Sequence, residues 1–583
     1  MIALAMVAAV VLVAVRLSVS GVRVARTPSD LFVASRAVST WWNAGAISGE
    51  YLSAASFLGI AGLTLKVGAS ALWQAVGFAA GYLALLLFVA APLRRYGSYT
   101  IADFAEARLG SAGLRLLSSV VVLVITGFYL VPQLKGAGIA LDELTDLPYW
   151  VGVVVVGAIV PLGVALGGMR GITYVQAFQF WVKLTAIAVP AVLLLIHLGG
   201  FPSGPALFGS SFPRAPAGGL TVTLPQPTRV GFPAASTYRD AAGTHHVRAH
   251  TRRALPAGKV AFPGGAVLPA GPGVTAERGA RWARPVTSGG NASPLFLYSL
   301  LLATFLGTMG LPHILVRFYT NPDGPAARRT TVSVLSLLGL FYLFPGIYGL
   351  LGRALSPGLY VTGQTDAVVL AVPRAAWPGL PGELLGGIVA AGAFAAFMST
   401  SSGLLVSIAG TLSYDVWPRM RPGHTIGSRA RQRHFRIAAP LGILIPVGLA
   451  LVAENLDISL LVGWAFALAA STFCPLFLLG IWWSRLTAAA AVAGIVLGGT
   501  LATTAIFLDL ADVGGSGAIA ALLAQPAVVT VPAAFATMIA VSLLRPRPAQ
   551  GGDRQMLALH APEELGFEVD VRDRNARVRV ANG

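Results

Sequence analysis

The chain has 583 residues, of which 55% are hydrophobic and only 11% are charged, and its mean hydropathy is +0.74. This composition excludes a soluble globular protein, which needs a more charged surface, and indicates a chain that is largely surrounded by lipid. The formal net charge is +18. The basic residues lie mostly in short gaps between apolar segments, which favours membrane orientation over a nucleic-acid partner as the reason for that charge. A single cysteine, Cys474, excludes an intrachain disulfide and a cysteine metal site.

Apolar runs of about 20 residues, the length that crosses roughly 30 Å of hydrocarbon, occur about thirteen times. In chain order they are Ile2–Val22, Trp41–Gly62, Ala71–Pro92, Leu116–Gly138, Trp150–Gly168, Ile172–Leu198, Leu295–Val316, Thr331–Leu351, Leu384–Thr411, Ile437–Val452, Leu460–Trp483, Leu486–Leu508 and Ala521–Leu544. We therefore expect an all-α polytopic membrane protein with about 13 transmembrane helices. The first run could be a cleaved signal peptide, but its positive charges follow the apolar stretch, so an uncleaved helix is favoured.

Basic residues occur in every second short gap, so they lie on one side of the predicted helices. One side carries Arg23, Arg26, Arg94, Arg95, Arg115, Arg170, Arg328, Arg329, Arg419, Arg485 and Arg545. Because short loops rich in Lys and Arg stay in the cytoplasm, this side is predicted to be cytoplasmic. We expect a protein of the cell membrane with its N-terminus outside and residues 545–583 as a cytoplasmic tail.

The longest gap, residues 199–293, is rich in Pro, Gly, Thr and Arg. The alternation places it outside, and the composition predicts a loosely ordered extracytoplasmic loop with room for short strands around Thr221–Leu224. His245, His246 and His250 share this loop and could bind a metal, although a tolerated insertion without a function is the favoured interpretation. The tail is polar, with possible short strands within Leu565–Val580.

The second apolar segment, WWNAGAISGEYLSAASFLGIAG, is crowded with small residues and holds Glu50 near mid-membrane. An acidic group at that depth is costly, so Glu50 either takes part in transport or pairs with a neighbouring helix. Small residues such as Gly49 allow close helix packing, but they also allow the helix to unwind. An unwound turn would expose backbone carbonyls that can bind Na⁺.

The seventh and ninth segments carry the other unusual features. In the seventh, Gly307, Gly310 and Pro312 interrupt an apolar helix that ends near Arg317, whose charge we expect to snorkel to the membrane surface. The second and seventh segments are five apart, which favours two inverted five-helix repeats. The ninth segment has four consecutive hydroxyls, Ser399–Ser402, which exceeds what bonding back to the helix requires. With nearby carbonyls, such hydroxyls could form an all-oxygen site for a hard monovalent cation.

These stretches resemble the sodium/solute symporter family, and most closely its acetate permease branch. The resemblance is carried by SGEYLSAASFLGIAG, GTMGLPHILVRFYT and WAFALAASTFCPLFLLGIWW, with support from GGMRGITYVQAFQFW and GSYTIADFAEARLG. It extends from Ser29 to about Trp483. It implies a LeuT-like 5+5 inverted-repeat core, with residues 29–198 and 294–485 as the two repeats. Residues 1–28 would form an additional N-terminal helix, and residues 486–544 two C-terminal helices.

The resemblance also implies binding residues. A Na⁺ ion would be held between the second and ninth segments by the carbonyls of Gly49, Leu52 and Ala396 and by the hydroxyls of Ser399 and Thr400. The candidate substrate residues are Glu50, Tyr51, Ser53, Gln133 and Thr308. No catalytic residue and no cofactor other than the coupling Na⁺ is expected.

The function expected from these features is Na⁺-coupled symport of a small solute by alternating access, with a short-chain monocarboxylate such as acetate as the first candidate. Pyruvate, propionate, proline or another amino acid, a sugar, and H⁺-coupled carboxylate uptake remain alternatives. A membrane sensor is less favoured because only a short tail follows Leu544, and an enzyme because the histidines do not cluster with acids. The expected partners are the solute and the lipid bilayer, not nucleic acid, and a small membrane partner protein remains an open possibility.

Overall fold

The computed structural model describes residues 2–22, 39–96, 100–145, 147–200, 211–286, 294–318, 324–420, 428–515, 517–544, 552–561, 567–568 and 579–580. Within these residues, eleven helices are long and apolar enough to cross a membrane. The first predicted segment coincides with α1 (Ile2–Val22), whose apolar part is shorter than those eleven. The structure therefore confirms a polytopic helical protein.

The helices before the long gap follow the predicted segments, with several breaks. They are α3 (Thr40–Tyr51), η2 (Ala55–Gly59), α4 (Ile60–Val67), η3 (Gly68–Ala71), α5 (Leu72–Leu85), η4 (Leu86–Ala90), α6 (Ala91–Tyr96), α7 (Ile101–Leu109), α8 (Ala112–Thr145) and α9 (Tyr149–His197). The fifth and sixth predicted segments both fall within α9, which contains two candidate spans.

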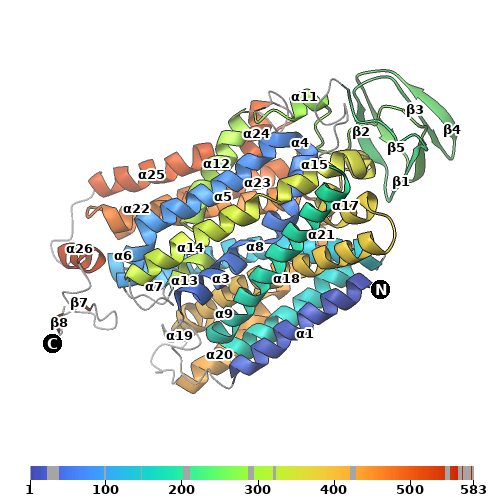
Figure 1. Ribbon diagram of the computed structural model, residues 1–583. Helices are drawn as coiled ribbons and strands as arrows, with labels where there is room; N and C mark the ends of the chain where they lie inside the picture. The colour runs from blue at the N-terminus through green and yellow to red at the C-terminus, as the bar shows by residue number, and fades with distance from the viewer. Residues whose placement is uncertain are drawn as a thin grey trace.

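The helices after the long gap are α12 (Pro294–Thr308), α13 (Pro312–Phe318), α14 (Gly324–Tyr342), α15 (Pro345–Leu355), α16 (Pro357–Thr362), η6 (Thr365–Ala367), α17 (Val368–Ala376), α18 (Leu380–Gly410), η7 (Thr411–Val416), α19 (Trp417–Met420), α20 (Ser428–Gly442), α21 (Leu444–Val452), α22 (Ile458–Trp482), α23 (Ala488–Leu510), α24 (Ala518–Ala524), α25 (Ala527–Leu544) and α26 (Gly552–His560). In α18 and α22, 89% of the most apolar window is buried, against 33% in α25. Two helices thus form the centre of the bundle, and α25 lies at its periphery (Figure 1).

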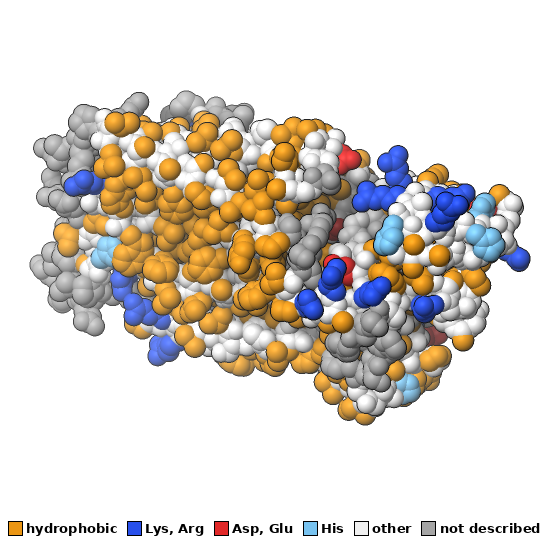
Figure 2. All heavy atoms as spheres, turned by 90° about the horizontal axis from the view of Figure 1, so that it is seen from above, with side chains coloured by type: hydrophobic (Ala, Val, Ile, Leu, Met, Phe, Trp, Pro, Cys, Tyr) orange, Lys and Arg blue, Asp and Glu red, His pale blue; other side chains and the backbone are white. Residues whose placement is uncertain are grey.

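Hydrophobic side chains cover the middle of the molecule, whereas Lys and Arg gather towards its ends (Figure 2). This distribution is what a lipid belt between two aqueous faces requires. The helix α1 begins at the end that carries the β-strands, and α26 lies at the opposite end (Figure 1). The start of α1 and α26 therefore lie at opposite ends of the helical bundle; the side of the membrane on which each lies stays a prediction.

An ionic cluster ties the elements together near the α26 end. Arg115 on α8 lies 2.7 Å from Glu106 on α7 and 2.6 Å from Asp415 in η7, and Arg419 lies 3.0 Å from Glu106. Partial burial would raise the pKa of Glu106, but the hydrogen bonds and charges of Arg115 and Arg419 outweigh it and lower that pKa. The cluster joins two parts of the chain that are about three hundred residues apart.

Residues 211–286 of the long gap are not loosely ordered, and for them that prediction was wrong. These residues contain six strands: β1 (Leu220–Leu224), β2 (Thr228–Phe232), β3 (Ser236–Asp240), β4 (Gly243–Val247), β5 (Thr251–Leu255) and β6 (Gly258–Phe262). They form an antiparallel sheet in the order β1-β6-β3-β4 and a separate pair, β2-β5. We call this unit the β-domain; it stands at one end of the helical bundle (Figure 1).

Alternating apolar residues explain why the β-domain folds despite its polar composition. Its buried side chains include Val222, Leu224, Phe232, Leu255, Val260 and Phe262, and the cluster continues onto Tyr360 and Val361 of α16. Composition averaged over the whole gap hides this alternation, which is the signal of a half-buried strand.

The predicted strands near Thr221 lie in β1, and those in the tail correspond to β7 (Phe567–Glu568) and β8 (Arg579–Val580). His245 bonds to Asp240 at 2.9 Å, whereas His246 contacts Thr237. Among the described residues, no group of three His, Cys, Asp or Glu side chains could hold a metal ion.

Leu255→Ala should destabilise the β-domain by about 2–5 kcal/mol, because it leaves a cavity at a fully buried position. Arg252→Ala, on the exposed side of the same strand, is the matched control and should change stability by less than about 0.5 kcal/mol. Limited proteolysis of the full-length protein measures this difference. Equal protection of both variants within 211–286 would show that the β-domain core does not hold this segment together.

Candidate functional site

The first helical break lies between α3 and η2. Leu52 leaves the helical conformation at φ −76° and ψ 88°, and the helix resumes around Ala55. The backbone N–H of Ala54 donates to Gln133 Oε1 at 2.8 Å, and the N–H of Ala55 donates to Ser53 Oγ at 3.2 Å. Side chains therefore satisfy the backbone groups that the break leaves free, as a membrane interior requires.

We expected the break at Gly49, but it falls three residues later, at Leu52. Gly49 itself is helical, and a side chain there would collide with the carbonyl of Gln176 on α9, since an added Cβ would lie 2.3 Å from that oxygen. Of the two roles considered for Gly49, close helix packing and local unwinding, the structure shows the packing of α3 against α9.

The second break lies between α12 and α13, where the sequence predicts it. α12 ends at Thr308 and α13 begins at Pro312, with Gly310 between them. Proline cannot continue the preceding helix, because it lacks the N–H and disfavours helical geometry in the residue before it. Gly310 also allows close approach to α22, since a Cβ there would lie 2.5 Å from the carbonyl of Ala469.

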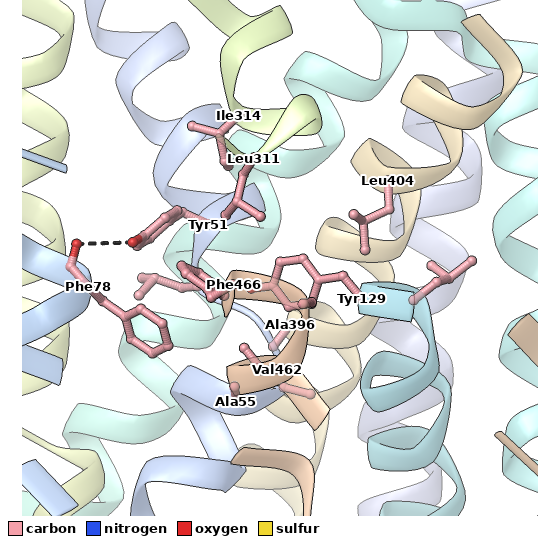
Figure 3. Packing of buried hydrophobic residues seen from close by; sticks show 14 of the residues in the cluster. Tyr51, Ala55, Phe78, Tyr129, Leu311, Ile314, Ala396, Leu404, Val462 and Phe466 are labelled. Atoms are coloured by element: carbon pink, nitrogen blue, oxygen red, sulfur yellow. Dashed lines mark hydrogen bonds between the residues drawn. The ribbon is translucent and has the colours of Figure 1, made fainter. Parts of the chain in front are cut away.

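The two breaks meet through one pair of hydroxyls. The Tyr51 hydroxyl lies 2.9 Å from Thr308 Oγ1 and donates to the carbonyl of Phe78 at 3.0 Å. Figure 3 shows Tyr51 reaching from α3 towards Phe78 on α5. Residues 257 positions apart in the chain are thereby joined at the centre of the bundle.

Aromatic rings surround this contact. The ring centroids of Phe78 and Phe466 are 4.9 Å apart, and those of Tyr129 and Phe466 are 5.7 Å apart (Figure 3). The Tyr129 hydroxyl donates to Ser53 Oγ at 3.2 Å. The structure thus brings four candidate substrate residues together at the breaks, namely Tyr51, Ser53, Gln133 and Thr308, and adds the rings that sequence reasoning missed. Nothing in the local sequence distinguishes those rings from other aromatic residues of the bundle.

Four of the five predicted Na⁺ ligand atoms converge between the break of α3 and the middle of α18, and the hydroxyl of the fifth, Thr400, lies beside them and bonds to a different carbonyl. Ser399 Oγ lies 2.7 Å from the Gly49 carbonyl and 3.0 Å from the Ala396 carbonyl, and Thr400 Oγ1 donates to the Glu50 carbonyl at 2.6 Å. All of these residues are buried. We call the group formed by the carbonyls of Gly49, Leu52 and Ala396 and the hydroxyl of Ser399 the oxygen cage.

Lys183 on α9 reaches into the oxygen cage, and sequence reasoning missed it. Its Nζ donates to the Gly49 carbonyl at 2.5 Å, to the Leu52 carbonyl at 2.7 Å and to Ser399 Oγ at 2.7 Å. Its side chain is fully buried. The signal was available, because Lys183 is the one Lys, Arg, Asp or Glu in the apolar run Ile172–Leu198, and an intramembrane charge is a functional candidate by default.

Arg317 does not snorkel to the surface, and that expectation was wrong. Its Nε pairs with the carboxylate of Glu50, its Nη1 donates to Thr173 Oγ1 at 2.9 Å, and its Nη2 bonds to Gln176 Oε1. Gln176 in turn donates to the Ser399 carbonyl at 2.7 Å. The Glu50 and Arg317 side chains are each only 1% exposed, so the pair is fully inside the bundle.

Of the two interpretations of Glu50, the structure shows the pairing with a neighbouring helix. The carboxylate also packs where Gly403 of α18 has no side chain, because a Cβ there would overlap it. Glu50 therefore belongs to the ionic group beside the oxygen cage, whereas the other four candidate substrate residues line the breaks. Within that group two positive charges, Lys183 and Arg317, accompany one negative charge.

Comparison with known proteins places these features in a family. A model described as the sodium:solute symporter family matches residues 31–206 and 270–498, which include both breaks, the oxygen cage and Lys183. A monocarboxylic acid transporter of Corynebacterium glutamicum is 31% identical over 518 residues, 87% of this chain and 85% of that protein. The uncharacterized symporter YwcA of Bacillus subtilis is 30% identical over 475 residues, 81% and 79% of the two chains.

Solved structures show the same fold. A Na⁺-coupled sialic acid symporter, in a substrate-bound outward-open state, has a TM-score of 0.67 with 14% identity, covering 94% of this chain and 99% of its own. Mhp1, a nucleobase-cation-symport-1 family transporter in a closed conformation, has a TM-score of 0.51 with 15% identity, covering 91% and 99%. The predicted LeuT-like helical fold is thereby confirmed.

Glu50→Gln should lower the free energy of unfolding by about 3–5 kcal/mol, because it leaves the buried charge of Arg317 without its carboxylate. Adding Arg317→Met should recover a large part of this loss, since both charges are then removed. Thermal unfolding in detergent compares the stability of the single and the double variant with that of the wild type. Glu106→Gln, which removes a carboxylate that is 30% exposed, is the control and should cost about 1 kcal/mol or less. A loss for Glu50→Gln as small as this would contradict a tightly buried pair.

Proposed function

The chain belongs to the sodium:solute symporter family, and on that premise we propose that it carries a short-chain monocarboxylate, such as acetate, by symport with a cation. Proteins of this family are membrane transporters and not enzymes, so the chain is a multi-pass secondary transporter of a small molecule. The solute and the coupling cation are proposals. We also propose the cell membrane as its location, with the N-terminus outside.

The meeting of the two helix breaks is the observation that carries the proposed solute site. Tyr51 and Thr308 supply hydroxyls there, and the N–H groups of Ala54 and Ala55 begin the helical segment that continues into α4. The N-terminus of a helix favours a negative charge, so a carboxylate can bind there without a dedicated arginine. In this proposal the carboxylate takes the place of Gln133 Oε1 on the Ala54 N–H.

The surroundings of the breaks favour a small solute with an apolar tail. Phe78, Tyr129 and Phe466 present rings, and the hydroxyls of Tyr51, Tyr129 and Thr308 among them are already paired within the protein. A sugar would need many more hydrogen-bond partners than this. The relative from Corynebacterium glutamicum, named a monocarboxylic acid transporter, supports the same class of solute. Pyruvate and propionate fit the proposal as well as acetate does.

Sodium and the proton are the candidates for the coupling cation. The family match and the fold shared with a Na⁺-coupled sialic acid symporter support sodium. The oxygen cage in which we expected this ion already receives the ammonium of Lys183. As they stand, therefore, the residues of the cage do not fit a sodium ion.

Proteoliposomes that contain the full-length protein should accumulate radiolabelled acetate when a membrane potential, negative inside, is imposed together with inward Na⁺ and H⁺ gradients. Dissipating all three gradients should abolish accumulation. A tenfold excess of propionate or pyruvate should reduce the initial rate strongly, whereas proline or glucose should leave it unchanged. Inhibition by proline or glucose in place of the carboxylates would reject the proposed solute class.

Thr308→Val should raise the KM for acetate by about fivefold, because it removes a hydroxyl at the proposed solute site, and one hydrogen bond contributes roughly 1 kcal/mol. Thr304→Val is the matched control, because both hydroxyls donate to a carbonyl within α12, at 2.8 Å for Thr304 and 2.7 Å for Thr308, and of the two it is Thr308 that also contacts Tyr51. Its KM should change by less than about twofold. Equal KM values for both variants would place the solute away from the breaks.

A further inference from the structure

Lys183 brings a positive charge to the place where the family resemblance puts the coupling ion. We infer that its ammonium is a tethered substitute for that ion, and that the oxygen cage of this chain therefore does not bind Na⁺ while Lys183 is present. The inference rests on the proposed transport function and deepens it, because it concerns the coupling cation of that transport. It assigns to Lys183 the role of determining which cation the cage accepts.

The hydrogen bonds of Lys183 are complete. A lysine ammonium has three donors and no acceptor. The three donors reach the carbonyls of Gly49 and Leu52 and the hydroxyl of Ser399, at 2.5, 2.7 and 2.7 Å. Because every donor has an acceptor, the cage is built for this charged group, and burial without such partners would be very unfavourable.

A sodium ion would need the same oxygen atoms. Backbone carbonyls and hydroxyls are the ligands that hard cations prefer, and three of the oxygens in the cage are already bonded to Lys183. Two positive charges that share ligands repel each other strongly inside a protein, where little water screens them. Na⁺ and the Lys183 ammonium therefore compete for the cage, and the tethered ammonium has the advantage of being covalently present.

The charges around the cage lead to the same conclusion. The carboxylate of Glu50 pairs with Arg317, so it is not free to neutralise an additional cation. Glu50, Arg317 and Lys183 together carry one net positive charge. Without Lys183 the group would be neutral, and a Na⁺ ion in the cage would restore the same net charge. Removing Lys183 should thus open a site that matches sodium in both ligands and charge.

Because Lys183 is part of the chain, its ammonium stays in the place of the ion throughout transport. It projects from α9, whereas the oxygens come from the break of α3 and from α18, and α9 packs against both helices. When helix bundles rock to expose the site to one side or the other, a free ion can leave. A lysine side chain stays attached to its helix, so this cage contributes no sodium ion to the transport stoichiometry.

Binding of ²²Na⁺ to the purified full-length protein in detergent tests the inference directly, by scintillation proximity. The wild type and the single variant Ser399→Ala should bind equal amounts of ²²Na⁺, because the cage of the wild type holds no sodium ion. Lys183→Ala should bind at least about tenfold more ²²Na⁺ than the wild type, and the added substitution Ser399→Ala should abolish this gain. Lys183→Met is the matched control, because it removes the same charge but fills the same space, and it should bind no more than the wild type.

Thermal unfolding provides a second measurement. NaCl should raise the unfolding temperature of Lys183→Ala more than an equal concentration of KCl does, and it should not do so for the wild type or for Lys183→Met. Saturable ²²Na⁺ binding by the wild type that Ser399→Ala removes would overturn the inference, and this comparison does not depend on the folding of any Lys183 variant. A Lys183→Ala protein that folds but gains no ²²Na⁺ binding would overturn it too.

Uptake separates this inference from the proposed function. Wild-type proteoliposomes with an imposed membrane potential and proton gradient should take up radiolabelled acetate at rates within about twofold whether the outside medium contains Na⁺ or choline. Absence of acetate uptake under every gradient would reject the proposed function, while the binding measurements would still decide the role of Lys183. Uptake that requires Na⁺, together with Ser399-dependent ²²Na⁺ binding by the wild type, would reject the inference and leave the function intact.

Discussion

A helix that breaks inside a membrane must find partners for the backbone groups it exposes, since lipid supplies none. In this protein the constraint acts on the break that follows Tyr51. Lys183 and Ser399 bond to the carbonyls on one side of it, and Gln133 takes the N–H of Ala54 on the other. The need to pair these backbone groups fixes the arrangement of the core, because α8, α9 and α18 must lie where their side chains reach the break.

The same constraint explains why charged residues occur in an otherwise apolar centre. Glu50, Arg317 and Lys183 come from α3, α13 and α9, and each is engaged by side chains or carbonyls of other helices. Buried ion pairs add little net stability, but a missing partner is costly. The charges therefore favour one mutual arrangement of these helices over others. A transporter that changes between a few defined conformations benefits from such a restriction more than from additional stability.

Several features were predictable from local sequence, and for identifiable reasons. Gly310 and Pro312 locate the break after Thr308, because proline and glycine act on the backbone of their own neighbourhood. The hydroxyls of Ser399 and Thr400, the first two in the run Ser399–Ser402, mark the part of α18 that faces the break of α3. By contrast, the β-domain was missed, because the composition of the whole gap 199–293 averages over short alternating strands. Arg317 was misjudged because its sequence position near a helix end does not reveal the direction of a long side chain.

The sequence by itself determined the solvent, the approximate number of spanning helices, the family and the helix break at Gly310 and Pro312. These depend on the length of apolar runs and on residues that act locally. Only the tertiary structure decided what fills the oxygen cage. Lys183 is 134 residues from Gly49 and 216 from Ser399, so their meeting depends on how α3, α9 and α18 pack. A lone lysine in an apolar run indicates importance, but its three hydrogen-bond acceptors become known only when the helices are assembled.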